Sequence, residues 1–201
     1  MTAPVETDNA PAPVDAAPAA ARTVHTARWV GIGVLVIAAG LVAVLATRPP
    51  AAVVEVQSPL VGAQAPPVRG VTVDGRRYAL PRAPGVFTVV NFFAAWCVPC
   101  QEEGPQLVAF NFQSKRSGDA QLVSVVFDDS ASDARSYQAT LGATWPTLAD
   151  PGGNLALSFG VRAPPSTFLI APDGRVVAFI EAPVTAADLD SLIARAKASG
   201  A

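Results

Sequence analysis

Asn91-Phe92-Phe93-Ala94-Ala95-Trp96-Cys97-Val98-Pro99-Cys100 is the stretch that decides the fold, because it places the chain's only two cysteines at the end of an apolar run. The β-branched and aromatic residues from Val86 to Phe93 predict a buried strand, and helical spacing of apolar residues predicts a helix from Val98 to Arg116. Unpaired backbone N–H groups at a helix start stabilise a thiolate. We therefore expect Cys97 to be the attacking sulfur and Cys100, one turn later, the resolving one.

Two other interpretations of a Cys-x-x-Cys pair are less favoured here. A structural zinc site needs four ligands, and the chain offers no further cysteine and only His25, which lies beyond an apolar segment. A purely structural disulfide would close a very short loop, which gives less than the ~3 kcal/mol expected for a 15-residue loop. A redox-exchanging pair is the favoured interpretation.

The N-terminal part of the chain is predicted to attach it to a membrane. Residues 1–28 are rich in Ala, Pro and Thr and predict a disordered cytoplasmic segment. Residues 29–46 carry no charge, and about 18 such residues form a helix of roughly 27 Å, close to the ~30 Å of a hydrocarbon core. With Arg22 and Arg28 before it, this segment predicts a single-pass signal anchor, with the C-terminal domain outside the cytoplasm. Cleavage after Ala46 as a signal peptide is the alternative.

The remaining sequence predicts a tether and one α/β domain. Residues 47–67 contain five prolines and read as a semi-extended tether, and residues 68–201 follow as the domain. The Asp-Gly turn within Val71–Leu80 predicts a β-hairpin that opens it. Later segments predict strands at 121–127, 166–170 and 175–180, helices at 133–141 and 154–159, a loop around Trp145-Pro146, and a last helix opened by a capping box from Thr185 to Asp188.

This order of strands and helices indicates a sheet covered on both faces. The 201 residues carry a net charge of −2 with both signs mixed, which gives no support for nucleic-acid binding. Asp128, Asp129 and Asp133 are expected in a solvated loop between a strand and a helix.

Two motifs together resemble the thioredoxin superfamily: Trp96-Cys97-Val98-Pro99-Cys100 at a strand-to-helix junction, and Pro165-Ser166-Thr167-Phe168-Leu169-Ile170 before an Asp-Gly hairpin. The chain is more closely similar to the membrane-anchored, extracytoplasmic thiol:disulfide proteins of the TlpA, ResA and CcmG type, associated with cytochrome c maturation. The resemblance runs from about Leu60 to Ala198. It implies a thioredoxin-like fold with an extra N-terminal β-hairpin.

The resemblance also implies roles for single residues near the cysteines. It makes Cys97 an exposed nucleophile and Cys100 its buried partner, together forming the redox-active disulfide. Glu103 matches a carboxylate near the active site, and its spacing from Cys100 places both on one helical face. The expected role is proton exchange with the sulfurs. Asn91 stands where thioredoxin has a buried aspartate, which leaves Glu103 as the expected proton-transfer carboxylate.

Three further residues are implied to dock the substrate. Pro165 matches the proline that the family holds in cis opposite the dithiol, and Trp96 matches the aromatic residue flanking it. Pro164 precedes the cis proline and has no backbone N–H to offer a partner.

By this resemblance, the chain reduces disulfides of an exported protein such as apocytochrome c and receives electrons from a membrane thiol carrier. No metal or organic cofactor is implied. A disulfide-introducing oxidant is an alternative that sequence does not separate, because the direction depends on reduction potential. A copper-delivery module is a weaker alternative, because residues 68–201 lack a histidine ligand. A thioredoxin-like peroxidase would place threonine where Ala94 stands.

Overall fold

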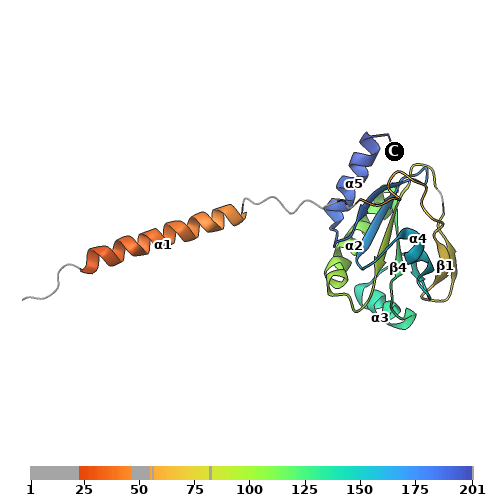
Figure 1. Cartoon of the computed structure of the whole chain (residues 1–201), viewed down its shortest axis with the longest axis horizontal. Coiled ribbons are helices and arrows are strands. Elements are labelled where there is room, and N and C mark those ends of the chain that lie inside the picture. Colours follow the sequence, from red (N-terminus) through yellow and green to blue (C-terminus); the bar gives the residue numbers. More distant parts are fainter. Residues whose placement is uncertain (1–22, 47–54, 56, 82, 201) are drawn as a thin grey trace, which may run out of the picture. The chain divides into compact units, whose positions relative to one another are not determined.

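The computed structural model describes residues 23–46, 55, 57–81 and 83–200, which belong to two separate units. In the first unit, the chain forms one helix, α1 (Thr23–Ala46) (Figure 1). It carries exposed apolar side chains that include Trp29, Leu35 and Ile37. The helix begins six residues before the expected apolar segment. No helix among the described residues meets the combined length and hydropathy that a membrane crossing requires.

The second unit is built on one mixed sheet with the strand order β2-β1-β5-β4-β3-β6-β7. Its strands are β1 (Arg69–Thr72), β2 (Arg77–Ala79), β3 (Phe87–Phe93), β4 (Ala120–Val126), β5 (Thr147–Ala149), β6 (Ser166–Ile170) and β7 (Val176–Ile180). Its helices are α2 (Val98–Ser117), α3 (Ala131–Leu141), α4 (Asn154–Phe159) and α5 (Ala186–Ala198). β3 runs parallel to β4 and antiparallel to β6, so it is an interior strand of the sheet, and it leads into α2.

Helices cover both faces of the sheet, as the sequence predicts (Figure 1). Neighbouring residues of a strand point to opposite faces, and all seven residues of β3 are buried. Val89 belongs to the core cluster that contains Leu107 of α2 and Leu189 of α5. Val90 belongs to the cluster that contains Phe159 of α4. Burial on both sides explains why the apolar residues of β3 do not alternate with polar ones.

Strand β5 lies where the sequence predicts only a loop. Thr147–Ala149 pairs in parallel with β4 and antiparallel with β1, so this short strand joins the N-terminal hairpin to the rest of the sheet. Three residues are too few to show a periodic pattern, and the strand forms because both neighbours offer their backbone groups to it.

A segment before the expected start of the domain also packs on it. The backbone N–H of Gly62 donates to the carbonyl of Val176 at 2.8 Å, and Val176 N–H donates to Ala63 at 2.9 Å. Residues 57–67 therefore run along β7 as part of the folded unit, although the sequence assigns them to the tether. Residues 47–54 and 56 lie outside the described residues.

Candidate active site

The two cysteines lie at the junction of β3 and α2, as the sequence predicts. Residues 94–96 follow β3, and Cys97 has the extended backbone of an N-cap residue, with φ −78° and ψ 107°. The Sγ atom of Cys97 accepts a hydrogen bond from the backbone N–H of Cys100 at 3.2 Å and is joined to the Sγ of Cys100 by a disulfide. The attacking sulfur thus occupies the position where the helix dipole favours negative charge.

Both cysteines are buried in this oxidised structure, with relative exposures of 4% for Cys97 and 2% for Cys100. The expectation of an exposed Cys97 is therefore wrong for the disulfide form. The reason is that Sγ of Cys97 turns inward to bond Cys100 and packs in a small cluster that includes Val73, Phe93 and Ala134. The exposed groups beside it are Trp96 at 57% and Val98 at 61%.

A cis proline lies at the same end of the sheet. The peptide bond between Pro164 and Pro165 is cis, which confirms the conformation that the resemblance implies for Pro165. In the antiparallel pairing of β3 with β6, Phe92 lies opposite Ser166, so Pro165 comes level with the end of β3. Pro165 is buried and Pro164 is half-buried. This end of the sheet therefore combines Trp96, Cys97 and the cis bond.

Glu103 lies on the inward face of α2 and is only 1% exposed. Its Oε2 accepts a hydrogen bond from Nδ2 of Asn91 at 2.9 Å, and its Oε1 accepts one from the N–H of Val184 at 3.0 Å. Burial raises the pKa of Glu103 from 4.5 to about 7, although both hydrogen bonds act to lower it. A carboxyl with this pKa can accept or release a proton near neutral pH.

Asn91 holds that carboxylate in place from the middle of β3. Its Nδ2 donates to Glu103 and also to the hydroxyl of Thr167 on β6 at 3.1 Å. Cys100 and Glu103 line one small internal cavity of about 10 Å³, to which Asn91 also contributes. The structure therefore brings the proposed resolving cysteine and the proposed proton acceptor together.

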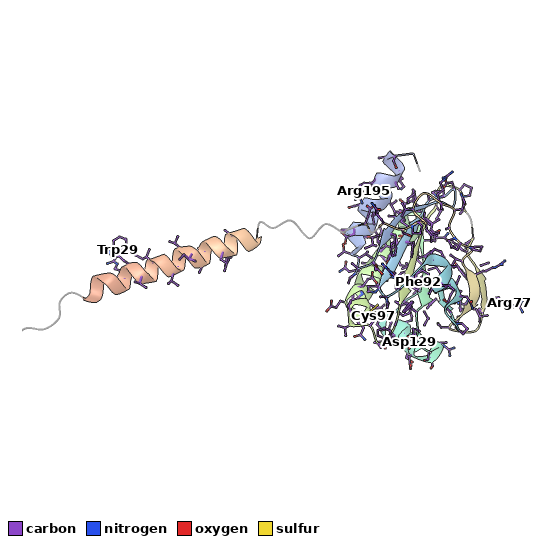
Figure 2. All side chains as sticks on the ribbon, viewed as in Figure 1. Trp29, Arg77, Phe92, Cys97, Asp129 and Arg195 are labelled. Atoms are coloured by element: carbon purple, nitrogen blue, oxygen red, sulfur yellow. A yellow bond between two sulfur atoms is a disulfide. The ribbon has the colours of Figure 1, made fainter. Side chains whose placement is uncertain are left out.

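The loop between β4 and α3 holds the residues that precede Cys97. Oδ2 of Asp129 accepts a hydrogen bond from the backbone N–H of Ala95 at 2.7 Å, and the indole N–H of Trp96 donates to the carbonyl of Asp128 at 3.1 Å. Figure 2 shows Cys97 and Asp129 at the same end of the domain. Asp128 has a left-handed φ of 46°, which is uncommon for a residue other than glycine.

The sequence predicts that these aspartates are solvated, and for Asp129 this prediction is wrong. Its carboxylate is half-buried and bonded to the active-site loop, 34 residues away in the chain. No local pattern signals such a contact, because it depends on β3 and β4 ending side by side.

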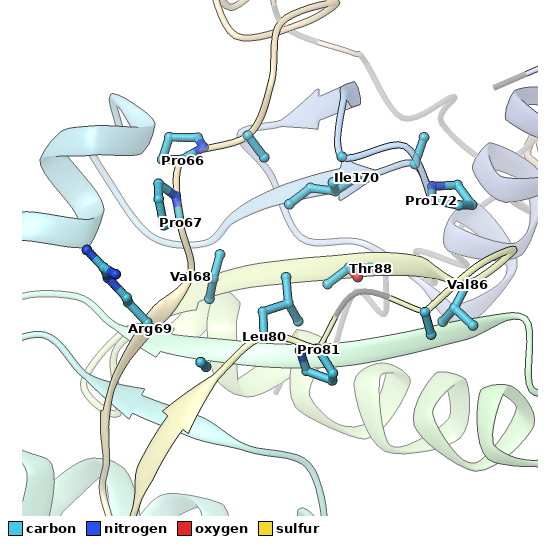
Figure 3. Close-up of a pocket in the computed structure, with 15 residues that line it drawn as sticks. Pro66, Pro67, Val68, Arg69, Leu80, Pro81, Val86, Thr88, Ile170 and Pro172 are labelled. Carbon is cyan, nitrogen blue, oxygen red and sulfur yellow. The ribbon is translucent and has the colours of Figure 1, made fainter.

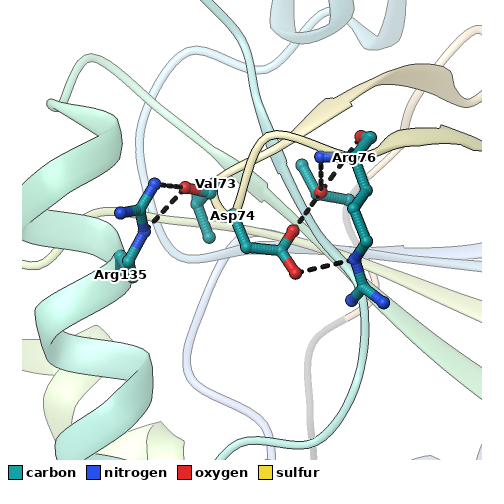
Figure 4. A network of polar contacts seen from close by, with 5 residues as sticks. Val73, Asp74, Arg76 and Arg135 are labelled. Atoms are coloured by element: carbon teal, nitrogen blue, oxygen red, sulfur yellow. Dashed lines mark hydrogen bonds and ion pairs between the residues drawn. The ribbon is translucent and has the colours of Figure 1, made fainter.

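The N-terminal hairpin is fixed to α3 beside the same cluster (Figure 4). The guanidinium group of Arg135 donates two hydrogen bonds to the carbonyl of Val73, one of them from Nε at 2.7 Å. Asp74 bonds Thr72 and forms an ion pair with Arg76 at 2.8 Å, which closes the turn. The hairpin therefore places Val73 against the cluster that contains both cysteines.

An apolar pocket of about 170 Å³ lies away from this site (Figure 3). Its lining includes Pro66, Leu80 and Val86, and also Thr88 and Ile170, which pair near the start of β3. It therefore belongs to the end of the sheet opposite Cys97. Within the described part of the chain, no group of three or more His, Cys, Asp or Glu side chains is placed to hold a metal.

Comparison with known proteins adds a family and a fold. Residues 61–179 match the AhpC/TSA family. The thiol:disulfide interchange protein HelX of Rhodobacter capsulatus is 34% identical over 102 residues, which is 50% of this chain and 55% of that protein. A DsbE homolog of Paracoccus denitrificans, also a thiol:disulfide interchange protein, is 35% identical over 124 residues, 60% of this chain and 65% of that protein. The chain thus spans about half to two thirds of these curated relatives.

A solved structure shows the same architecture. The crystal structure of a thioredoxin-family thiol:disulfide interchange protein from Chlorobium tepidum superposes with a TM-score of 0.60 at 28% identity. It covers 70% of this chain, and this chain covers 99% of it. The predicted thioredoxin-like α/β fold is confirmed.

Proposed function

The chain belongs to the AhpC/TSA family, and on that premise we propose that it is a thiol:disulfide oxidoreductase that uses Cys97 and Cys100. The observation that carries the proposal is the disulfide between these residues at the start of α2, at the same end of the sheet as a cis proline. Ala94 stands where thioredoxin-like peroxidases carry threonine, so a disulfide rather than a peroxide is the expected electrophile.

The reaction starts from the reduced pair. The Cys97 thiolate attacks one sulfur of a substrate disulfide, which forms a mixed disulfide and releases the first substrate thiolate. The Cys100 thiol loses its proton, and the resulting thiolate attacks Sγ of Cys97. This second step forms the Cys97–Cys100 bond and releases the second substrate thiolate, so two electrons pass from the protein to the substrate.

Glu103 is proposed as the base for the second step. It is the buried carboxylate that lines the same cavity as Cys100, and a pKa of about 7 suits proton transfer near neutral pH. Trp96, Pro164 and Pro165 are proposed to receive the substrate's backbone. Because Pro164 has no N–H, that contact depends on its carbonyl and ring.

The proposed direction is reduction of an exported protein, with apocytochrome c as the proposed substrate and a membrane thiol carrier as the electron source. Support comes from the similarity to HelX and to the DsbE homolog, both thiol:disulfide interchange proteins. The measurement is the equilibrium reduction potential of the Cys97–Cys100 pair against glutathione. A value near about −270 mV or below supports a reductant, and a value near about −120 mV an oxidant.

Replacing Cys97 tests the activity itself. The Cys97→Ser variant is expected to lose reduction of insulin and of glutathione disulfide, because it removes the sulfur at the N-cap of α2, where the helix dipole favours the thiolate. Cys100→Ser is the matched control, since it keeps the attacking sulfur and is expected to stop at a mixed disulfide. Full turnover by Cys97→Ser would refute the proposed function.

We further propose that residues 29–46 anchor the chain in the cell membrane with the folded unit outside the cytoplasm. The support is the uncharged apolar sequence preceded by arginines. The test is to compare the full chain with a chain that starts at residue 55. Only the full chain is expected in the membrane fraction, with its folded unit open to digestion by protease added outside intact cells. Recovery of a soluble form starting after Ala46 would indicate a cleaved signal peptide instead.

A further inference from the structure

Tyr137 connects helix α3 to the first turn of α2. Its hydroxyl donates a hydrogen bond to the backbone carbonyl of Cys100 at 3.0 Å, although the two residues are 37 positions apart. The ring lies against Phe93, the last residue of β3, with the centroids 5.8 Å apart. Tyr137 also lines the small cavity that contains Cys100 and Glu103. Tyr137 therefore contacts the backbone of Cys100 from the side of α3 and Phe93.

Gly104 makes this contact possible. A Cβ atom at position 104 would lie 2.3 Å from the hydroxyl oxygen of Tyr137 and 3.0 Å from the side chain of Leu141. Separations below 3.0 Å require something to move, so any larger residue would displace the hydroxyl. Glycine inside a helix is destabilising relative to alanine, because it loses more conformational freedom on folding. The close approach of α3 to α2 gives a physical reason for glycine at this position.

The first turn of α2 has a particular need for outside support. Pro105 lies inside the helix and has no N–H to donate to the carbonyl of Gln101, the residue directly after Cys100. The peptide between Cys100 and Gln101 is the one that Tyr137 holds through its carbonyl. Holding this peptide restrains the backbone of Cys100 and therefore the direction in which its Cβ atom, which carries Sγ, leaves the helix.

We propose that Tyr137, in the space left by Gly104, is a positioning residue that aims the sulfur of Cys100 at Cys97 during the second step of exchange. This rests on the proposed function and assigns to α3 a part in it. In that step the Cys100 thiolate bonds to Sγ of Cys97, the bond between Cys97 and the substrate sulfur breaks, and the substrate leaves as a thiolate. The first step, attack by Cys97, does not use Tyr137.

The two steps are separated by reacting the reduced full-length chain in detergent with glutathione disulfide. Samples quenched in acid at increasing times are analysed by mass spectrometry for the mixed disulfide between Cys97 and glutathione. In Tyr137→Phe, formation of the mixed disulfide is expected to proceed at the wild-type rate, and its resolution by Cys100 about three- to tenfold more slowly. This is the range that loss of one uncharged hydrogen bond produces. The mixed disulfide therefore accumulates transiently.

Three further variants make the result specific. Gly104→Ala keeps the hydroxyl of Tyr137 but displaces it, and is expected to slow resolution by Cys100 as well. The unfolding transition shows whether Tyr137→Phe and Gly104→Ala fold, and one folded variant is enough for the test. Tyr78→Phe removes the hydroxyl of the half-buried tyrosine on β2 and is expected to leave both steps unchanged. Cys100→Ser gives the limit in which the mixed disulfide persists.

The outcomes distinguish this inference from the proposed function. If the wild-type chain forms no mixed disulfide with glutathione, the proposed function fails. If the wild type reacts normally and Tyr137→Phe resolves the mixed disulfide at the wild-type rate, only the positioning role fails. Equal slowing of formation and resolution also overturns it, because that pattern indicates a general structural role.

Discussion

Glu103 shows how folding changes the chemistry of a single residue. In an unfolded chain its carboxyl group titrates near 4.5, whereas burial on the inner face of α2 moves its pKa to about 7. Two hydrogen bonds to Glu103 offset only part of this effect. The folded state therefore holds the proton more tightly than the unfolded state between these two pH values.

This difference predicts a pH dependence of stability. Because the folded pKa is raised, the contribution of Glu103 to the free energy of unfolding is fully present below about pH 4.5 and is lost as the pH rises through about 7. The loss is of the order of 3 kcal/mol. The glutamine of Glu103→Gln cannot ionise. The free energy of unfolding of the wild type minus that of this variant, measured by urea denaturation, is therefore expected to fall by this amount between pH 4.5 and pH 8.

Glu102 provides the control for this measurement. It is exposed on the same helix, so Glu102→Gln is expected to leave the pH dependence unchanged. Parallel stability curves for the wild type and Glu103→Gln would show that the carboxyl at position 103 titrates alike in both states.

At the scale of elements, the loop between β4 and α3 supports the loop between β3 and α2. Its contacts are the bond from Ala95 N–H to the Asp129 carboxylate and the bond from the Trp96 indole to the carbonyl of Asp128. We expect Asp129→Ala to lower the free energy of unfolding by about 1.5–3 kcal/mol, the value of a hydrogen bond to a charged group. Asp129→Asn keeps an acceptor for the N–H of Ala95, so its free energy of unfolding is expected to fall by less.

The exposed Asp133 is the control, because its carboxylate is solvated at the first turn of α3. Asp133→Asn is expected to cost at most about 1 kcal/mol, from the helix dipole alone. Equal losses for Asp129→Ala and Asp133→Asn in chemical denaturation would contradict a supporting role for Asp129.

The start of α5 offers a second prediction at this scale. Thr185 and Asp188 form the capping box that the sequence predicts, with both reciprocal hydrogen bonds present. Thr185→Ala is expected to cost about 1 kcal/mol, since it removes the acceptor for an N-terminal backbone N–H. Thermal unfolding against the control Thr140→Ala, an exposed position inside α3, measures the cap separately from helix propensity. A Thr185→Ala variant that unfolds at the wild-type temperature would mean that the cap adds nothing.

At the scale of the whole molecule, residues 57–67 close one edge of the sheet. Three backbone hydrogen bonds join this segment to β7 and the turn before it: Gly62 to Val176, Val176 to Ala63, and Ala65 to Gly174. Leu60 packs on the core beneath α4. An open β7 would present unpaired N–H and C=O groups to other chains, so the segment protects the domain from edge-to-edge association.

Truncation tests this role. A chain that starts at residue 68 is expected to be less stable than one that starts at residue 55 by about 2–4 kcal/mol, from three net hydrogen bonds and the lost packing of Leu60. It is also expected to associate at high concentration. Chemical denaturation and analytical ultracentrifugation measure the two effects, and equal stability of both monomeric chains would contradict them.

Elements whose signals are local can be predicted from the amino-acid sequence alone. The β-branched and aromatic residues of β3 predict a buried strand. The Cys-x-x-Cys pair after it marks the start of one helix, and the capping box at Thr185 marks the start of another. Spacing alone also placed Glu103 on the face of Cys100. Each of these follows from backbone periodicity or capping within a few residues, so no distant contact is needed to predict it.

Only the tertiary structure decided the features that join distant segments. Three such features depend on which strands lie side by side. They are strand β5, the docking of residues 57–67 on β7, and the hydrogen bonds of Asp129 to Ala95 and of Tyr137 to Cys100. The burial of Cys97 and the raised pKa of Glu103 both follow from the side chains packed around them. Desolvation and hydrogen bonds between residues far apart in the sequence depend on how the elements pack. The local sequence pattern therefore does not predict them.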